Sequence, residues 1–404
     1  MNTHKAILGL DAEQAGVDYH LIDTNHNLLA RGSAEASQAG LDTLNAALAK
    51  HHLAWADVLV GVEATGQWHL HWCEKLHASG AKVYAVNPLV AKRTTALPNA
   101  IRDNKTDPID AAGLAELVQR EHTRLTHFLY TPASALFKLQ RLQNARQAVR
   151  EKLTDLKKSL GALRDLVFPE LHALRFSDKT ERAIIKKAPT PAQVLALETK
   201  ELKTLARDKT AALRKAAAQS FASASLSEAS ASALVHLALT VEDMERQLER
   251  MDADIEKQAR EALDNELLEA AQTLPGFGRK TTVAILSNIP VGLLQASGLS
   301  RRKLSNKIQA HMGADPRVRQ SGKKKGRMAI SKRGSRYART ALYQAAVCAV
   351  MNDPSLQAIY KALKARGKHH TVAMFDIARR LIRRLVAVIK SLPKNYIQSA
   401  IQPA

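Results

Sequence analysis

Cysteine is scarce in this sequence, and long apolar runs are missing. Two cysteines, Cys73 and Cys348, cannot form a disulfide framework or a four-thiolate zinc site, which favours a reducing compartment. No uninterrupted stretch reaches the ~18 apolar residues that a membrane helix needs. Asp11 interrupts the N-terminal sequence before the apolar segment of a signal peptide develops. These absences predict a soluble, cytoplasmic protein without a membrane partner.

Acidic residues are also few relative to basic ones. The 404 residues hold 60 Lys and Arg against 38 Asp and Glu, a formal net charge of +22. The imbalance is local: residues 1–130 hold 11 basic and 14 acidic side chains, whereas residues 271–350 hold 16 basic side chains and one acid, Asp315. A concentrated positive field is typical of a protein that binds a polyanion. The pattern therefore predicts a nucleic-acid partner that the back half of the chain grips.

Short apolar runs alternate with helical spacings in the first part of the chain. Runs rich in Val, Ile and Leu between turn residues predict strands, and leucines three or four residues apart predict helices. We expect strands within residues 5–14, 17–32, 57–66 and 82–88, and helices within residues 39–52 and 68–80. This order indicates an α/β domain, placed at residues 1–130.

The remaining sequence has mainly helical patterns. Residues 131–270 combine leucines at helical spacing with dense charged residues, which predicts a long helical, coiled-coil-like spacer. Residues 271–404 are expected to form a mainly α C-terminal domain. It opens with LPGFGRKTT, whose turn is like that of a helix-hairpin-helix element, and the backbone N–H groups there can hold a phosphate without reading bases. The residues concerned are Gly276, Gly278, Arg279 and Lys280. A plain turn between helices is the alternative.

Four carboxylates follow predicted strands or begin a predicted helix. Asp11 ends the first strand and Glu63 ends the strand VLVGVE, while Asp107 and Asp110 lie in NKTDPIDA at a helix start. If the strand order brings these ends together, four carboxylates need cations, and their oxygens select Mg²⁺ or Mn²⁺. Two such ions roughly 3.5–4 Å apart can clamp a phosphodiester. A single Asp at such a position is more often structural, so the prediction depends on the combination.

A glycine-containing basic segment, RVRQSGKKKGRMAISKRGSRYAR, spans residues 317–339. Its cations are expected to contact nucleic acid: Arg317, Arg319, Lys323, Lys324, Lys325, Arg327, Lys332, Arg333 and Arg336. Ser321 lies among them. A serine that attacks phosphorus needs a lowered pKa or a stabilised leaving oxygen, and surrounding cations help both. The alternative is a basic loop that only screens phosphates.

Several of these motifs together resemble the insertion sequence 110 class of transposases. GLDAEQ, GVEATGQWHLHWCEKLHASGAKVYAVNPLVAKR and NKTDPIDAAGLAEL are similar to the N-terminal DEDD domain of that class. LPGFGRKTTVAILSNI, HMGADPRVRQSGKKKG and ISKRGSRYARTALYQAA are similar to its C-terminal transposase domain. The resemblance covers both ends of the chain and leaves the helical middle without a distinctive motif.

The resemblance implies a RuvC-like, RNase H-type fold at the front and a helical, serine-bearing domain at the back. By position, Asp11, Glu63, Asp107 and Asp110 match the family's metal-binding acids, and Ser321 matches its catalytic serine. In that family the serine forms a covalent link to DNA in a composite site between subunits. Members act as oligomers and use a noncoding bridge RNA that pairs with donor and target DNA. The resemblance therefore implies a dimeric or tetrameric recombinase of a mobile element.

Two other functions are compatible with the same residues. In a metal-dependent junction endonuclease the acids would activate water, and Ser321 would only contact phosphate. In a non-catalytic nucleic-acid scaffold neither group would react. A covalent adduct with DNA distinguishes the recombinase, metal-dependent hydrolysis without an adduct distinguishes the nuclease, and binding alone distinguishes the scaffold.

Overall fold

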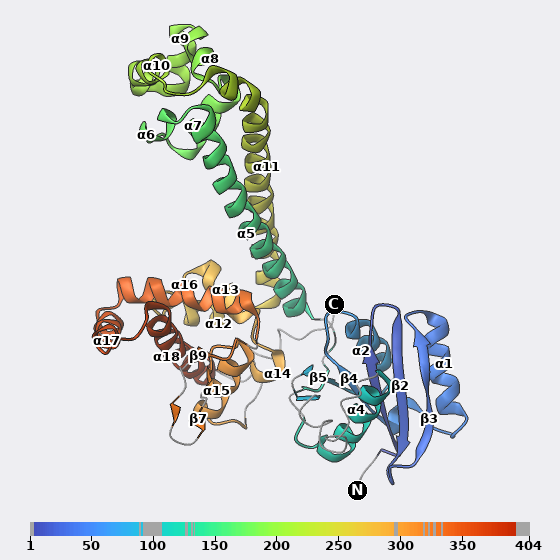
Figure 1. Cartoon of the computed structure of the whole chain (residues 1–404). Coiled ribbons are helices and arrows are strands. Elements are labelled where there is room, and N and C mark those ends of the chain that lie inside the picture. The colour runs from blue at the N-terminus through green and yellow to red at the C-terminus, as the bar shows by residue number, and fades with distance from the viewer. Residues whose placement is uncertain are drawn as a thin grey trace. The chain divides into compact units, whose positions relative to one another are not determined.

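The chain divides into two compact units, residues 1–134 and 135–402 (Figure 1). The computed structural model describes residues 4–88, 90–91, 107–125, 128–130, 132, 134–294, 298–317, 320–321, 324–325, 329–332 and 334–392. For residues 107–109, 317, 320–321, 324–325 and 329 it describes the backbone alone. The predicted spacer and the predicted C-terminal domain both belong to the second unit, and the division into three domains stays a prediction.

The first unit is built on a five-stranded mixed sheet with the order β3-β2-β1-β4-β5. The strands are β1 (Ala6–Ala12), β2 (Gly16–Asp23), β3 (Leu28–Glu35), β4 (Val58–Glu63) and β5 (Lys82–Val86). The first three form an antiparallel meander, whereas β1, β4 and β5 are parallel to one another. The carboxyl ends of β1, β4 and β5 therefore lie at the same edge of the sheet.

Helices cover both faces of this sheet. Helices α1 (Gln38–Ala49) and α2 (His69–Ala78) pack on the face that carries Leu8, Leu10 and Val60. Helix α4 (Asp107–Glu121) packs on the opposite face, which carries Ile7 and Leu59. Because successive side chains of a strand point to opposite faces, β1 and β4 are apolar on both sides, as strands between two helical layers must be. The predicted α/β organisation is confirmed.

Strand β3 is the one element of this sheet that the sequence did not predict. It lies at the edge, and most of its side chains are exposed or half-buried. Residues 17–32 were expected to hold one strand, but β2 ends at Asp23 and β3 begins at Leu28 and continues to Glu35. A strand at the edge of a sheet can keep most of its side chains in contact with water. Such a strand needs no continuous apolar run.

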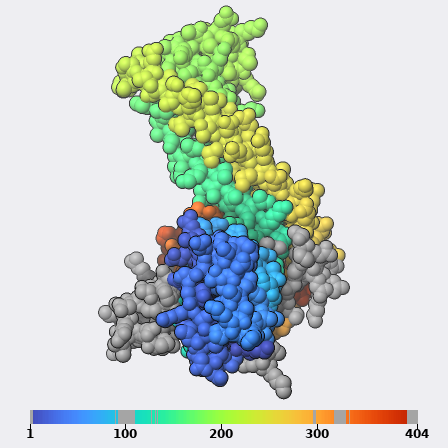
Figure 2. All heavy atoms as spheres, turned by 90° about the vertical axis from the view of Figure 1, so that its right-hand side faces the viewer, coloured from blue at the N-terminus to red at the C-terminus, as the bar shows by residue number. Residues whose placement is uncertain are grey.

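The second unit contains two long antiparallel helices, α5 (Ala135–Val167) and α11 (Ala224–Ala262). They lie side by side in both views (Figures 1 and 2). Ion pairs join them, with Arg146 to Asp252 at 2.8 Å and Lys157 to Glu245 at 2.6 Å. Of the described helices, α11 alone has the length and apolar composition of a membrane span, and only by that test.

Short helices at the far end of this pair enclose a small apolar core of their own. They are α6 (Glu170–Ala173), α7 (Asp178–Lys187), α8 (Pro191–Ala196), α9 (Thr199–Ala206), η3 (Arg207–Lys209) and α10 (Thr210–Ala218). The core includes Phe168, Leu202 and Leu234. The end of the helical pair is therefore a folded cap rather than a simple loop.

The other end of the pair joins a larger helical core. Its helices are α12 (Asn265–Gln272), α13 (Arg279–Leu286), α14 (Val291–Leu294), α15 (Arg301–His311), α16 (Arg336–Asn352), α17 (Pro354–Ala365) and α18 (His370–Ser391). Four two-residue strands lie between α15 and α16: β6 (Pro316–Arg317), β7 (Gln320–Ser321), β8 (Lys324–Lys325) and β9 (Ala329–Ile330). The mainly helical character predicted for this part of the chain is confirmed.

Candidate functional site

Two facing glycines let helix α4 lie directly on the sheet. Gly9 of β1 pairs with Gly61 of β4 in the parallel register. A Cβ atom on Gly9 would lie 2.0 Å from the carbonyl oxygen of Ala111, and one on Gly61 would lie 2.6 Å from a methyl carbon of Val118. No side chain fits in either place, so only glycine allows the helix and strands to approach this closely.

Helix α4 runs antiparallel to β1, and polar contacts near its C-terminal end fix this direction. Glu116 pairs with His26 at 2.8 Å, and the amide of Gln119 donates to the carbonyl oxygen of Thr24 at 2.8 Å. Thr24 and His26 lie in the turn after β2, beside the start of β1. The N-terminal end of α4 therefore lies at the edge of the sheet where β1 and β4 end.

The backbone places all four predicted acids at this edge of the sheet. Asp11 and Glu63 each follow the paired glycines by two residues, so they face the same side of the sheet as α4. Both are half-buried, and the hydroxyl of Thr65 donates to Glu63 at 2.9 Å. Asp110 is half-buried in the first turn of α4, and Asp107 begins that helix, although its side chain lies outside the described part.

A fifth acid, Asp18, was missed by the sequence reasoning. It pairs directly with Asp11 across the antiparallel β1–β2 hairpin, so both carboxylates lie on the same face. The hydroxyl of Ser33 donates to Asp18 from β3. Like charges directly opposite one another on a sheet repel. The register of the hairpin, with its turn before Gly16, was the signal that could have placed Asp18 there.

This edge offers the oxygen ligands that a hard divalent cation prefers. Among the side chains that the structure describes, no three Asp, Glu, His or Cys residues already form a metal cluster. The side chain of Asp107 is outside that set. Chemically, the donor set of Asp11, Glu63, Asp110 and Asp107 consists of the carboxylate oxygens that a hard divalent cation prefers.

The predicted phosphate-binding turn joins α12 to α13. Gly276 has a φ of +82°, and a Cβ there would lie 2.1 Å from the carbonyl oxygen of Ala345 in α16. Phe277 is buried beneath the turn. Gly278 is the N-cap of α13, and a Cβ added to it would meet open space. The turn thus packs against α16 at Gly276. At Gly278, by contrast, no atom lies within 4 Å of the position that a Cβ would occupy.

The two cations that follow this turn have acidic partners in α11. Arg279 contacts Glu256 at 2.8 Å, and Lys280 contacts Asp252 at 2.8 Å. Arg146 of α5 contacts the same Asp252. Burial alone would raise the pKa of Asp252, but hydrogen bonds from Arg146 and Lys280 outweigh it and lower the pKa. The hydrogen bond from Arg279 likewise lowers the pKa of Glu256.

Ser321 lies in a short β-hairpin. Its backbone pairs with Lys324, and that of Gln320 pairs with Lys325. Pro316 and Arg317 pair with Ile330 and Ala329. In the sequence, the β7–β8 pair therefore lies between the two strands of the β6–β9 pair. The side chains of Ser321, Arg317, Lys324 and Lys325 are not described, and Arg319, Lys323, Arg327 and Arg333 lie outside the described residues.

Contacts at the base of this hairpin attach it to the end of α15. The Ser331 hydroxyl donates to Asp315, and the Lys332 amide donates to the carbonyl oxygen of Gly313 at 3.1 Å. A Cβ on Gly334 would lie 1.8 Å from the carbonyl oxygen of His311. The ion pair between Arg336 and Glu151, at 2.6 Å, adds a contact to α5. The side chain of Lys332 is exposed.

Comparison with known proteins gives two family matches. A family model described as "Transposase" matches residues 8–169, which include the sheet and α4. A second model, described as "Transposase IS116/IS110/IS902 family", matches residues 268–361, which include the α12–α13 turn and the Ser321 hairpin. The chain belongs to the IS110 family of transposases. The two matches leave α11 and the helices of the cap uncovered.

Two curated relatives come from insertion elements. An IS900 element protein of Mycobacterium paratuberculosis, named as an uncharacterized 42 kDa protein, is 27% identical over 40% of this chain and 38% of its own length. An uncharacterized 43.6 kDa protein of the IS110 element of Streptomyces coelicolor is 28% identical over 33% of both chains. This IS110-family chain thus spans little more than a third of the relatives that it matches.

Proposed function

We propose that this protein is a recombinase that cuts and rejoins donor and target DNA for a mobile element in the cytosol. The observation that supports it most is that β1, β4 and α4 place acidic residues at one sheet edge, two residues beyond the Gly9–Gly61 pair on the face that α4 covers. Such an edge suits metal-assisted chemistry at a phosphodiester, and membership of a transposase family fits that substrate. The RuvC-like nature of the fold is part of the proposal.

In this proposal, Asp11, Glu63, Asp107 and Asp110 hold Mg²⁺, or Mn²⁺ in its place. The bound ion supplies Lewis-acid stabilisation of negative charge at the phosphate. Because strands and a helix carry these carboxylates, we expect little rearrangement of the backbone when the charge develops. Asp18, which accepts from Ser33 and lies opposite Asp11, is not one of the four proposed ligands. It would increase the attraction of this edge for a cation.

Ser321 is the proposed nucleophile. Its Oγ forms a bond to phosphorus as the phosphodiester P–O bond breaks, and the leaving oxygen takes up a proton to become a hydroxyl. Reversal with a hydroxyl of another strand rejoins DNA and frees the serine. Lysines next to Ser321 in the sequence, Lys323 to Lys325, would stabilise the negative charge that develops.

Base pairing by a bridge RNA is proposed to supply sequence specificity. The protein would then need to grip backbones rather than read bases, which suits 16 basic residues and one acid in residues 271–350. The acids and Ser321 belong to different compact units. A dimer or tetramer in which units of different subunits complete the site is therefore part of the proposal.

The experiment compares strand transfer and nucleic-acid binding in Asp11→Asn and in the wild type. We expect Asp11→Asn to lower strand transfer at least a hundredfold while binding stays near the wild-type value, because a metal ligand is lost from the less basic unit. Asp42→Asn, which removes an exposed carboxylate of α1, is the matched control and should keep both activities. Chelation of divalent cations should abolish transfer in the wild type, and Mg²⁺ or Mn²⁺ should restore it.

A loss of binding in Asp11→Asn, measured in a filter assay, would contradict the assigned role of Asp11. Unchanged strand transfer in Asp11→Asn would remove the acids from the mechanism altogether.

A further inference from the structure

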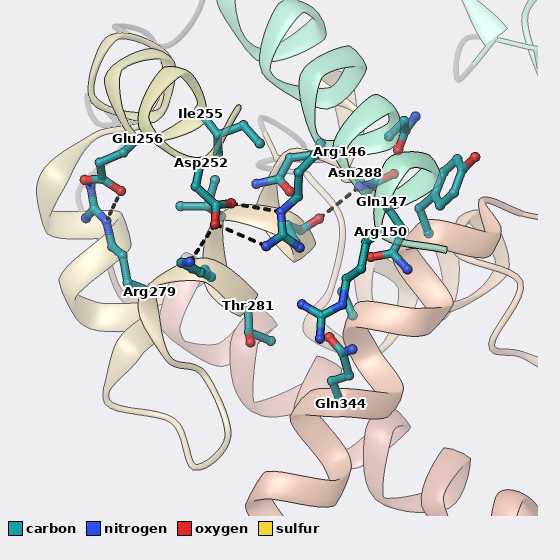
Figure 3. Close-up of a pocket in the computed structure, with 17 residues that line it drawn as sticks. Arg146, Gln147, Arg150, Asp252, Ile255, Glu256, Arg279, Thr281, Asn288 and Gln344 are labelled. Atoms are coloured by element: carbon teal, nitrogen blue, oxygen red, sulfur yellow. Dashed lines mark hydrogen bonds and ion pairs between the residues drawn. The ribbon is translucent and has the colours of Figure 1, made fainter. Parts of the chain in front are cut away.

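A cavity of about 370 Å³ lies where α5, α11, α13 and α16 meet in the second unit (Figure 3). Its volume is within the range of about 300–1,000 Å³ that is typical of small-molecule sites. It begins beside the α12–α13 turn, because Arg279, Lys280 and Thr281 of the first turn of α13 line it. None of its lining residues belongs to the acidic edge or to the Ser321 hairpin.

Carboxamide side chains make up part of the polar lining of this cavity. They come from two helices and the segment after α13: Gln143, Asn144 and Gln147 of α5, Gln344 of α16, and Asn288. Asn288 is only 2% exposed, and its amide nitrogen donates to the carbonyl oxygen of Ala284. Its side-chain oxygen has no partner among the described residues, and neither does that of Asn144. Two buried acceptors in one cavity therefore lack donors.

Such unpaired buried acceptors are costly, since each keeps the desolvation penalty without a hydrogen bond in return. Native proteins retain them mainly where a ligand or an ordered water supplies the donor. A ligand for this cavity should therefore present N–H or O–H groups to Asn288 and Asn144.

The charges in the cavity add a second requirement. Arg146, Arg279 and Lys280 are paired with the carboxylates of Asp252 and Glu256. Arg150 is also a lining residue; its side chain is exposed, and its guanidinium has no carboxylate partner in the described part of the chain. In Figure 3 it extends into the cavity toward Gln344. The same ligand should therefore also carry an anionic group.

Apolar side chains complete the lining. Ile255, Val283, Ala284 and Ala341 contribute to it, and the ring of Tyr337 is nearby. A flat ring could lie on these surfaces while its edge meets the carboxamides. A ring with amino donors, linked to a phosphate, is the chemistry of a nucleotide with an exocyclic amino group.

We propose that this cavity takes one unstacked nucleotide of a single-stranded nucleic acid. The base presents its amino group to Asn288 and Asn144, and the adjoining phosphate pairs with Arg150. Adenine, cytosine and guanine carry that amino group, whereas thymine and uracil do not. The inference rests on the proposed function. It adds a contact between the protein and a base that involves neither the reacting residues nor base pairing with the bridge RNA.

The test measures fluorescence anisotropy of labelled single-stranded oligonucleotides with the full-length protein at fixed salt. One DNA series and one RNA series carry a single central adenine, cytosine, guanine, thymine or uracil, or an abasic site, in an otherwise uniform strand of abasic nucleotides. The wild type should bind the adenine, cytosine or guanine strand roughly tenfold more tightly than the abasic one, the equivalent of one or two hydrogen bonds. The series, DNA or RNA, with the larger difference in affinity between base-bearing and abasic strands identifies which nucleic acid the cavity takes.

Two variants localise the effect. Asn288→Leu keeps the side-chain size but removes the acceptor, so the preference for amino-bearing bases should vanish while abasic binding stays. Its melting temperature reports whether it folds. Arg150→Gln should weaken binding of base-bearing strands without removing the order of bases. Arg246→Gln removes an exposed arginine of α11 that does not line the cavity, and it should leave the preference intact.

Equal binding of base-bearing and abasic strands by the wild type would overturn this inference and leave the proposed function standing. So would an unchanged preference for amino-bearing bases in Asn288→Leu together with unchanged binding of base-bearing strands by Arg150→Gln. Failure of the wild type to bind any oligonucleotide would overturn the proposed function, and this inference with it.

Discussion

At the scale of single residues, the position of α4 depends on Gly9 and Gly61. Their missing side chains let the helix backbone contact the strands, and this contact sets where Asp107 and Asp110 stand relative to Asp11. A backbone contact cannot move aside as a flexible side chain can. The acidic edge is therefore sensitive to any substitution at these glycines.

Gly9→Val should displace α4 from the sheet and lower the free energy of unfolding by about 3 kcal/mol or more, since overpacking typically costs 1–3 kcal/mol. Chemical denaturation followed by circular dichroism measures it. Gly32→Ala is the control, because its added Cβ would lie 3.1 Å from the end of the movable Tyr19 side chain. Equal stability of Gly9→Val and the wild type would contradict the close packing of α4.

Asp353 is a second residue with a measurable consequence. It caps α17 by accepting from the backbone amides of Ser355 and Leu356, and it pairs with Arg384 of α18 at 3.0 Å. The Ser355 hydroxyl and Arg384 lower the pKa of Asp353 to about 2. An unfolded Asp has a pKa of about 3.9. Because the folded pKa is the lower one, its stabilisation is full above about pH 4 and is lost as the pH falls toward about 2.

Asp353→Asn keeps a capping oxygen but cannot pair as an anion. Its melting temperature should be lower than that of the wild type at pH 6, and the gap should close between about pH 4 and pH 2. Thermal denaturation at several pH values measures this. A gap that stays constant over the range would show that the charge of Asp353 does not stabilise the fold.

At the scale of elements, local patterns predicted most strands and helices of the first unit. The apolar runs around Leu8 and Val60 indicated β1 and β4, and the leucines of α1 indicated its buried face. The edge strand β3 was missed because it has no apolar run. The carboxyl ends of β1 and β4 could be anticipated, but the Asp11–Asp18 pair required the hairpin register.

Contacts between distant elements could not be read from the sequence. Arg279 and Lys280 were predicted to meet phosphate, and nothing nearby in the sequence indicated that Glu256 and Asp252 of α11 contact them. The cavity below α13 combines side chains that are up to two hundred positions apart in the chain. Such sites depend on helix packing, which local periodicity does not specify.

The ion pairs of α13 lead to a prediction at this scale. Asp252→Asn should remove the anion between Arg146 and Lys280, leaving both cations available to phosphate. Nucleic-acid binding should tighten, and the slope of log K against log salt should steepen by roughly one unit for each new phosphate contact. Asp254→Asn removes the same charge from an exposed position of α11 that does not line the cavity and serves as the control.

A salt titration of binding distinguishes the two variants. An unchanged slope for Asp252→Asn, or the same change in Asp254→Asn, would show that α13 cations do not reach phosphate.

At the scale of the whole molecule, charge and chemistry are divided along the chain. The less basic first unit holds the acidic edge, and the basic second unit holds Ser321 and most of the cations. This division suits an enzyme whose cations grip nucleic acid while carboxylates act at the reacting phosphate. It also makes the reaction depend on both units, so loss of either reacting group should stop strand transfer.

The most direct measurement is a denaturing gel of the purified protein with Mg²⁺, the noncoding RNA of its element and end-labelled DNA across the element junction. Wild type, Ser321→Ala and Asp11→Asn are compared side by side. The account predicts label that migrates with the wild-type protein and is absent from both variants. Free cleavage products in the wild type and in Ser321→Ala, without label on the protein, would contradict it and assign the chemistry to the acids alone.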